Sequence, residues 1–243
     1  MIEKEIQKYL AEKGLKKMSL KAVLFDMDGV LFDSMKNHAK AWHEAMKIYG
    51  FDLPQPEAYL HEGRTGAGTI NIVSQRQRGY DATEEEIQRI YKTKSDLFNS
   101  LPTAEPMPGA DTLLKQLEDN GIIRVLVTGS GQKTLLERLN KHYPNAFTQE
   151  RMVTAFDVTY GKPNPEPYLM GLKKSGCQPN EVVVVENAPL GVRAAVAAGL
   201  FTIAVNTGPL DDHYLLDEGA NILFHSMQEL SDNWQKVQDE LQQ

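Results

Sequence analysis

Short apolar runs alternate with amphipathic stretches along most of the chain. An apolar run that ends at turn residues indicates a buried strand, whereas apolar residues at every third or fourth position indicate a helix. We predict strands over about residues 21–26, 122–128, 181–185, 201–205 and 221–223. We predict helices over residues 110–120, 132–142, 190–198, about 211–218, and a polar C-terminal segment. This alternation is typical of an α/β protein with a doubly wound parallel sheet, a Rossmann-like core.

The interval over residues 34–103 has a different pattern. It contains no strong strand signal, and helical stretches dominate it, for example at residues 37–49 and 83–99. The second stretch begins at Thr83, and the three glutamates that follow it make a good capping-box start. The interval therefore predicts an inserted α-helical cap domain, which would exclude water from a site beneath it and contribute to substrate specificity.

These patterns divide the chain into three parts. We predict an N-terminal extension over residues 1–19, an α/β core domain made of residues 20–33 and 104–243, and the cap domain over residues 34–103. The extension is charged and amphipathic between Ile2 and Lys17. That pattern suits either a short surface helix or a poorly ordered arm.

Composition narrows the class of protein. The formal net charge of −7 argues against general nucleic-acid binding, which needs a basic surface. No run of about 20 apolar residues is present, so we expect no membrane span, and the N-terminus lacks the apolar core of a secretion signal. The single cysteine, Cys177, cannot form an internal disulfide, which suits a reducing cytoplasm. We expect a cytoplasmic protein; its oligomeric state stays open, and a monomer fits the sequence.

Two carboxylates follow the first predicted strand. Asp26 and Asp28 end its apolar run and precede Gly29. In an open α/β sheet, ligands bind at the carboxyl ends of the strands. Two carboxylates there repel each other unless a cation or a shared proton separates them, and Mg²⁺ is the simplest hard cation for oxygen ligands. Rather than a solvated acidic turn, we predict Asp26 as a nucleophile that forms an aspartyl-phosphate and Asp28 as the general acid/base.

Three later segments extend this pattern. Thr128-Gly129-Ser130-Gly131-Gln132 follows a predicted strand, Lys162 lies in a proline-rich loop, and Glu186-Asn187 ends another strand. Together with the two aspartates, they closely resemble the haloacid dehalogenase superfamily of aspartate-nucleophile phosphatases, and within it the β-phosphoglucomutase-like branch. The resemblance extends from Leu20 to the C-terminus. It implies Mg²⁺ as cofactor and a small phosphorylated substrate.

The resemblance also implies roles for these segments. Thr128 would contact the phosphate, and Gly129 and Ser130 are secondary candidates because hydroxyls and exposed amides at a strand-to-helix turn can hold phosphate oxygens. Taken alone, this segment would favour an ordinary helix N-cap at Ser130, and its position beside Asp26 favours the phosphate role. Lys162 would neutralise the phosphate and Asp26 together.

The segment that would complete the metal site departs from the family. Relatives commonly have an acidic residue where this chain has Asn187, whose amide oxygen can bind Mg²⁺ but brings no charge. The other candidate ligands are Asp26, Asp28, whose backbone carbonyl binds the metal in the family, and Glu186, directly or through a water. Glu62 of the predicted cap is a further candidate that would supply the missing charge when the cap closes. Alternatively, Glu62 only pairs with a neighbouring arginine or caps a turn.

Further cap residues are candidate substrate contacts. The guanidinium of Arg64 can bind phosphate in a bidentate manner. Lys94 or Lys92 of the second cap helix would face the cleft. His38 and Trp42 lie on one face of the first cap helix, and the resemblance implies that His38 aligns the acid/base. The structural alternatives are solvated lysines, a core hydrogen bond for His38 and simple packing for Trp42.

Three functions fit these residues. The first is a β-phosphoglucomutase-like enzyme that transfers a phosphoryl group within a sugar phosphate through an aspartyl-phosphate. The second is a phosphohydrolase of a small phosphate ester or inorganic pyrophosphate, favoured if Glu62 enters the cleft, because its carboxylate would repel and crowd a sugar phosphate. The third is a non-catalytic binding protein of the same fold, which the presence of both Asp26 and Asp28 argues against.

Overall fold

One parallel sheet forms the centre of the structure. The computed structural model describes residues 2–130 and 135–242. Its strands are β1 (Ala22–Phe25), β2 (Ile123–Val127), β3 (Met152–Val153), β4 (Val182–Glu186), β5 (Phe201–Val205) and β6 (Ile222–Phe224). They pair in the order β3-β2-β1-β4-β5-β6, and every neighbouring pair is parallel. The predicted doubly wound α/β fold is therefore confirmed.

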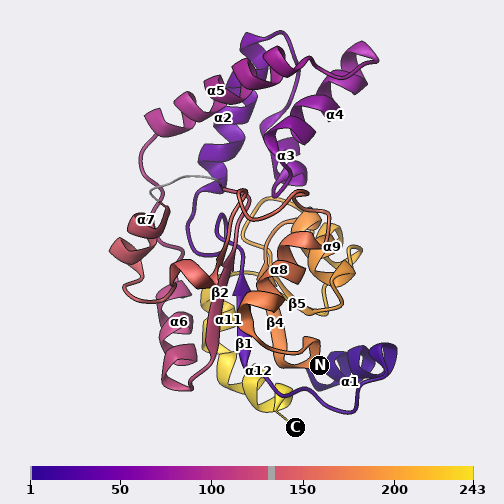
Figure 1. Cartoon of the computed structure of the whole chain (residues 1–243), viewed down its shortest axis with the longest axis vertical. Coiled ribbons are helices and arrows are strands. Elements are labelled where there is room, and N and C mark those ends of the chain that lie inside the picture. The colour runs from indigo at the N-terminus through magenta and orange to yellow at the C-terminus, as the bar shows by residue number, and fades with distance from the viewer. Residues whose placement is uncertain (1, 131–134, 243) are drawn as a thin grey trace.

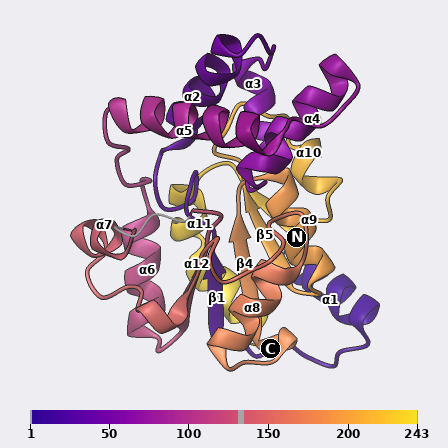
Figure 2. The ribbon, with the colours of Figure 1, turned by 45° about the horizontal axis from the view of Figure 1, so that its top comes forward.

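Helices cover both faces of this sheet (Figure 2). They are α1 (Ile2–Lys13), α6 (Ala110–Asp119), α7 (Leu135–His142), α8 (Glu166–Ser175), α9 (Pro189–Ala197), α10 (His213–Leu216), α11 (Met227–Asp232) and α12 (Trp234–Leu241), with 3-10 turns η2 (Gln149–Arg151) and η3 (Pro179–Glu181). Val23 and Phe25 of β1 pack in one core with α1, α6, α7, α11 and α12. Ala22 and Leu24 point to the opposite core, with α8 and α9. This alternation is what a strand buried on both faces produces.

The N-terminal extension is a helix that packs on the core. α1 buries Ile6, Tyr9 and Leu10. The Tyr9 hydroxyl donates to the Gly199 carbonyl at 2.8 Å, and its ring meets Phe201 edge-on with centroids 5.3 Å apart. Of the two forms that the sequence left open, the structure shows the helix, because its apolar face has a surface to cover.

A separate group of helices lies beyond one end of the sheet, at the top of Figure 1. It consists of α2 (Met35–Ile48), α3 (Gln55–Ala58), η1 (Tyr59–His61), α4 (Gly66–Arg78) and α5 (Glu84–Ser100). These helices share an apolar core of their own that includes Met46 and Ile70. Thr83 and Glu86 form the expected capping box at the start of α5. We propose that residues 34–103 act as a cap domain inserted into the α/β core.

Several elements escaped the sequence pattern. β3 has only two residues, and α4 begins with Gly66-Ala67-Gly68, where helix propensity is low. Helix α8 was not predicted, because prolines lie before it and within its first turn. Proline is tolerated at these positions, since the first amides of a helix have no intrahelical partner. The helix predicted over 132–142 is described from Leu135 onward, and Gln132 lies outside the described residues.

No helix in the described ranges is long and apolar enough to cross a membrane.

Candidate active site

The loop after β1 carries both aspartates. The Asp26 amide donates to the Val185 carbonyl at 3.0 Å, which keeps the chain beside β4 as far as the nucleophile candidate. Gly29 then turns the chain with φ +88°, and a Cβ there would lie 2.0 Å from Asn187 Nδ2. Only glycine therefore fits at this position, and the close approach brings the Asp26–Asp28 loop against the segment that ends β4.

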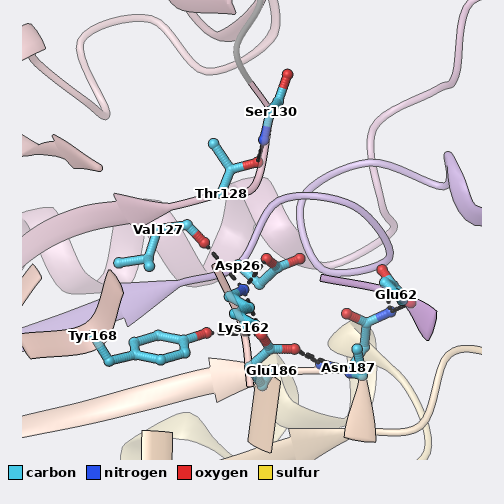
Figure 3. Close-up of polar contacts among 10 residues, drawn as sticks. Asp26, Glu62, Val127, Thr128, Ser130, Lys162, Tyr168, Glu186 and Asn187 are labelled. Atoms are coloured by element: carbon cyan, nitrogen blue, oxygen red, sulfur yellow. Dashed lines mark hydrogen bonds and ion pairs between the residues drawn. The ribbon is translucent and has the colours of Figure 1, made fainter. Parts of the chain in front are cut away.

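Lys162 links Asp26 to Glu186 (Figure 3). Its Nζ pairs with Asp26 Oδ1 and with Glu186 Oε1, the latter at 2.6 Å, and donates to the Val127 carbonyl at 3.3 Å. All three charged side chains are buried, and a buried charge needs such partners. Burial lowers the pKa of Lys162, but Asp26 and Glu186 raise it by more, so the lysine stays charged. The expected contact between Lys162 and Asp26, the candidate nucleophile, is present.

Glu186 is fully engaged by the protein. Besides Lys162, Oε1 accepts from the Tyr168 hydroxyl at 2.8 Å. Oε2 accepts from the amides of Asn187 at 2.8 Å and Ala188 at 3.0 Å. This arrangement argues against our expectation of Glu186 as a direct metal ligand, because donors already occupy both oxygens. It pairs instead with Lys162, the lysine that also contacts Asp26.

Two side chains contact Asp28, one just before α2 and one within it. The Ser34 hydroxyl donates to Asp28 Oδ1, and His38 Nε2 lies 3.4 Å from the same oxygen. Burial raises the pKa of Asp28, but His38 and Ser34 lower it by more, so it lies below its usual range. Lys94 Nζ is 2.9 Å from His38 Nδ1. Since an ammonium only donates, Nδ1 accepts and Nε2 carries the proton that faces Asp28. The structure thus brings His38 and Lys94 together at the candidate acid/base.

Trp42 lies beside the group formed by Asp28, His38 and Lys94, whereas Lys92 does not. Lys94 Nζ lies 5.4 Å from the centre of the Trp42 ring. Burial lowers the pKa of Lys94 to about 8. Lys92 instead is exposed and pairs with Asp96 at 2.6 Å. The choice between the two lysines therefore falls on Lys94.

The candidate phosphate loop follows β2. Thr128 is buried, its amide donates to the Val153 carbonyl at 2.9 Å, and its Oγ1 accepts from the Ser130 amide at 3.1 Å. Gly129 is exposed between them. Gly131 and Gln132 lie outside the described residues, so the alternative of Ser130 as a helix N-cap is not tested. Thr128 and Gly129 face a cavity that Lys162 also lines.

This cavity lies between the cap and the core and measures about 80 Å³. The cap side contributes Gly63, Arg64 and Thr65. The cap and the core pack closely here, because a Cβ at Gly63 would lie 2.9 Å from Lys162 Cδ. Arg64 Nε is buried and has no hydrogen-bond partner among the described residues. A buried guanidinium nitrogen without a partner suits the expected role of Arg64 in binding an anion.

Glu62 reaches from the cap to Asn187 (Figure 3). Asn187 Nδ2 donates to both carboxylate oxygens of Glu62, at 3.2 and 3.3 Å. Burial, then Asp26, Glu186 and Asp28, raise the pKa of Glu62 well above its ordinary value. Among the described residues, Glu62 forms no ion pair with the neighbouring arginine. Four carboxylates therefore converge on one small region, and Lys162 is the ammonium that pairs directly with two of them, Asp26 and Glu186.

The oxygen atoms at this point fit a hard cation. Asn187 Oδ1 is buried and has no hydrogen-bond partner in the described part of the chain, although its Nδ2 is used. Across residues 2–130 and 135–242, no three His, Cys, Asp or Glu side chains are grouped closely enough to hold a metal on their own. A site for Mg²⁺ would thus combine the carboxylates of Asp26 and Glu62 with the Asn187 amide oxygen and the Asp28 backbone carbonyl.

The sequence profile of haloacid dehalogenase-like hydrolases matches residues 23–205, most of the chain. The chain belongs to this family. Hexitol phosphatase A of Escherichia coli (strain K12) is 31% identical over 215 residues, which cover 88% of this chain and 94% of that protein. The phosphorylated carbohydrates phosphatase of Thermotoga maritima is 32% identical over 205 residues, covering 83% and 92%.

A solved structure extends the likeness over the whole chain. A protein from Bacteroides vulgatus that bears the name putative beta-phosphoglucomutase is 60% identical, has a TM-score of 0.97, and matches over 100% of this chain and 98% of that one. These comparisons confirm the resemblance to the haloacid dehalogenase superfamily and identify the protein as a phosphatase- or phosphomutase-type enzyme. The non-catalytic alternative is therefore set aside.

Two residues of the site were not anticipated. Ser34 lies six positions after Asp28, and its hydrogen bond to that aspartate depends on the turn at Gly29. Tyr168 lies in α8, the helix that the prolines concealed. Had the first-turn prolines been taken as a helix start, Tyr168 would have been placed near the lysine loop.

Replacing Asn187 with alanine is expected to raise the Mg²⁺ concentration for half-maximal phosphate release by at least about 10-fold, because the variant loses one oxygen ligand. The measurement is a Mg²⁺ titration of EDTA-treated protein. Asn180→Ala is the matched control, since Asn180 precedes β4, at the opposite end of that strand from Asn187, and its side-chain amide donates to the Lys17 carbonyl at 3.3 Å. An unchanged midpoint in Asn187→Ala would show that Asn187 is not a ligand, and full activity in EDTA would contradict the metal site itself.

Proposed function

We propose that this enzyme is a Mg²⁺-dependent phosphohydrolase of a compact phosphate compound, with inorganic pyrophosphate as the leading candidate. The observation that carries the proposal is the contact between Glu62 and Asn187. The contact supports the proposal because it sets a cap carboxylate beside Asn187, where Glu62, ionised on Mg²⁺ binding, would restore the charge that Asn187 lacks. The neighbouring cavity, lined by Arg64 and Lys162, measures about 80 Å³, whereas sites for drug-sized ligands measure about 300–1,000 Å³.

The charges around the site support a small anion. Lys162 and Arg64 line the cavity, and Lys94 stands behind His38 at the acid/base. A pyrophosphate presents a phosphate at each end, so it can use cationic groups at both the transferred and the leaving end. A hexose would need hydroxyl partners and more room.

The chain's own residues supply each step of the proposed reaction. The Asp26 carboxylate attacks phosphorus and the bond from phosphorus to the leaving oxygen breaks, so that the second phosphate of pyrophosphate departs as an anion while Asp28 stays ionised as the base for the next step. Water then attacks the aspartyl-phosphate, gives a proton to Asp28, and breaks the bond between phosphorus and Asp26. Lys162 and Thr128 hold the phosphoryl oxygens throughout. Mg²⁺, held by Asp26, Glu62, Asn187 and the Asp28 carbonyl, would offset the negative charge of these groups.

A second candidate is the phosphomutase reaction on a sugar phosphate. The name of the Bacteroides vulgatus protein favours it, while the names of the two bacterial phosphatases favour hydrolysis of phosphorylated carbohydrates. The mutase requires that water stay out and that a hexose fit beneath the cap. The position of Glu62 makes both the charge and the space less suitable for that substrate.

A substrate screen separates these functions. Purified protein with Mg²⁺ is offered inorganic pyrophosphate, small phosphate esters and hexose phosphates, and both phosphate release and isomerisation are scored. We expect kcat/KM for pyrophosphate to exceed that for hexose phosphates by about 10²-fold, equivalent to about 2.7 kcal/mol. Efficient conversion of β-glucose 1-phosphate to glucose 6-phosphate with little phosphate release would overturn the proposal and favour the mutase.

A further inference from the structure

Tyr168 contacts both partners in the ion-pair network of the nucleophile. It lies in the first turns of α8 and is fully buried. Its hydroxyl donates to Glu186 Oε1 at 2.8 Å, and Lys162 Nζ lies 5.0 Å from the centre of its ring (Figure 3). At this distance the ammonium is attracted to the face of the ring. One side chain therefore touches the carboxylate and the ammonium that together face Asp26.

Glu186 itself has no freedom to adjust. Its Oε2 is fixed by two backbone amides at the start of α9. On the other side, a Cβ at Gly191 would lie only 1.7 Å from Oε1, so the carboxylate fills the space that this glycine leaves. If one donor to Oε1 is removed, Lys162 is the group that can move in response.

Lys162 is shared between two acceptors. Glu186 Oε1 accepts from Lys162 and from Tyr168, and Asp26 Oδ1 accepts from Lys162. The Tyr168 hydroxyl reduces the pull of Oε1 on the ammonium. Burial and Glu186 raise the pKa of Tyr168 well above its ordinary value, so the hydroxyl keeps its proton and remains a donor. Without it, Lys162 would move toward Glu186 and away from Asp26.

We propose that Tyr168 is a positioning residue for phosphoryl transfer, which holds Glu186 and supports Lys162 so that the ammonium stays directed at Asp26 and the transferred group. The inference rests on the proposed aspartyl-phosphate mechanism and deepens it. The charge of Lys162 matters most in the transition state, when the phosphoryl group lies between the leaving oxygen and Asp26. Loss of the Tyr168 hydroxyl should therefore affect the transition state more than substrate binding.

The test compares Tyr168→Phe with Tyr9→Phe. Both tyrosines are buried, and each donates one hydrogen bond of 2.8 Å. Tyr9 bonds to the Gly199 carbonyl, which precedes β5 at the end of that strand opposite the site. Each variant therefore loses one buried hydroxyl, and only Tyr168→Phe loses it at the site. Both variants should lose similar thermal stability. We expect Tyr168→Phe to lower kcat by about 10-fold, with KM within about 3-fold, whereas Tyr9→Phe keeps the wild-type kcat.

A second readout does not depend on turnover. Beryllium fluoride with Mg²⁺ mimics the aspartyl-phosphate, and its binding should weaken in Tyr168→Phe but not in Tyr9→Phe. Assays are made at a temperature at which circular dichroism shows both variants folded. Equal kcat and equal beryllium fluoride binding in the two variants, with active wild-type protein, would overturn the inference alone. Wild-type protein that neither releases phosphate nor binds beryllium fluoride would overturn the proposed function and this inference with it.

Discussion

Replacing Asp26 with asparagine is expected to reduce the rate of phosphate release by about 10⁴-fold or more, equivalent to over about 5 kcal/mol of barrier. The amide has the shape of the carboxylate but is a poor nucleophile, so no aspartyl-phosphate forms. The fold should survive, because Lys162 keeps Glu186 and the Val127 carbonyl as partners. Rates with Mg²⁺ and the melting temperature are the two measurements.

The same substitution should also change how stability depends on pH. Burial raises the pKa of Asp26, Glu186 and Asp28 raise it further, and Lys162 only partly offsets them. A carboxyl group whose folded pKa exceeds its unfolded value makes the fold less stable as pH rises above the ordinary carboxyl range. Asp26→Asn avoids this loss. In EDTA, its melting temperature relative to wild type should therefore increase as pH rises above about 4.

Asp33→Asn is the matched control for both measurements. It makes the same chemical change between β1 and α2, but the Asp33 side chain is 43% exposed and forms an ion pair with Lys36, at 3.5 Å, away from Lys162. We expect its rate to stay close to wild type. Asp26→Asn protein that turns over at a rate near wild type would rule out Asp26 as the nucleophile.

The sequence predicted the structure correctly where a short segment alone determines the secondary structure, as for the strands. The apolar runs before Asp26, Thr128 and Glu186 each predicted a strand, and parallel strands place their carboxyl ends at one edge. That reasoning was enough to bring the aspartates, the phosphate loop and Asn187 together. The sequence could not decide whether the segment of α1 forms a helix, because its apolar residues stabilise a helix only where a surface of the core is available to cover.

Contacts between distant segments could not be predicted in the same way. Glu62 and Asn187 are 125 positions apart, and only the packing of the cap on the core decides whether they meet. The hydrogen-bond partners of Glu186 could not be predicted for a related reason. Its acidic side chain resembles a metal ligand in sequence, but its partners include a tyrosine from a helix that the pattern did not show and two backbone amides.

Replacing Glu62 with glutamine is expected to lower kcat/KM for phosphate release by about 10²-fold, or about 2.7 kcal/mol. Glutamine keeps an oxygen near Asn187 but removes the charge that the site needs to hold Mg²⁺. In EDTA, however, Glu62→Gln should melt at a higher temperature than wild type, because burial, and then Asp26, Glu186 and Asp28, raise the pKa of Glu62, and a carboxyl with a raised pKa costs stability above its ordinary range. On addition of Mg²⁺, wild type should gain more thermal stability than the variant.

The opposite signs of these two effects distinguish a metal ligand from a residue that only caps a turn. Glu85→Gln is the control, because Glu85 lies on α5 with its side chain 81% exposed and pairs with Arg89 of the same helix, at 3.7 Å. It should change neither the rate nor the response to Mg²⁺. If Glu62→Gln behaves like Glu85→Gln, Glu62 lies outside the metal site and the argument from charge against a larger substrate is lost. A hexose phosphate would then again be the better candidate, and with it the mutase reaction.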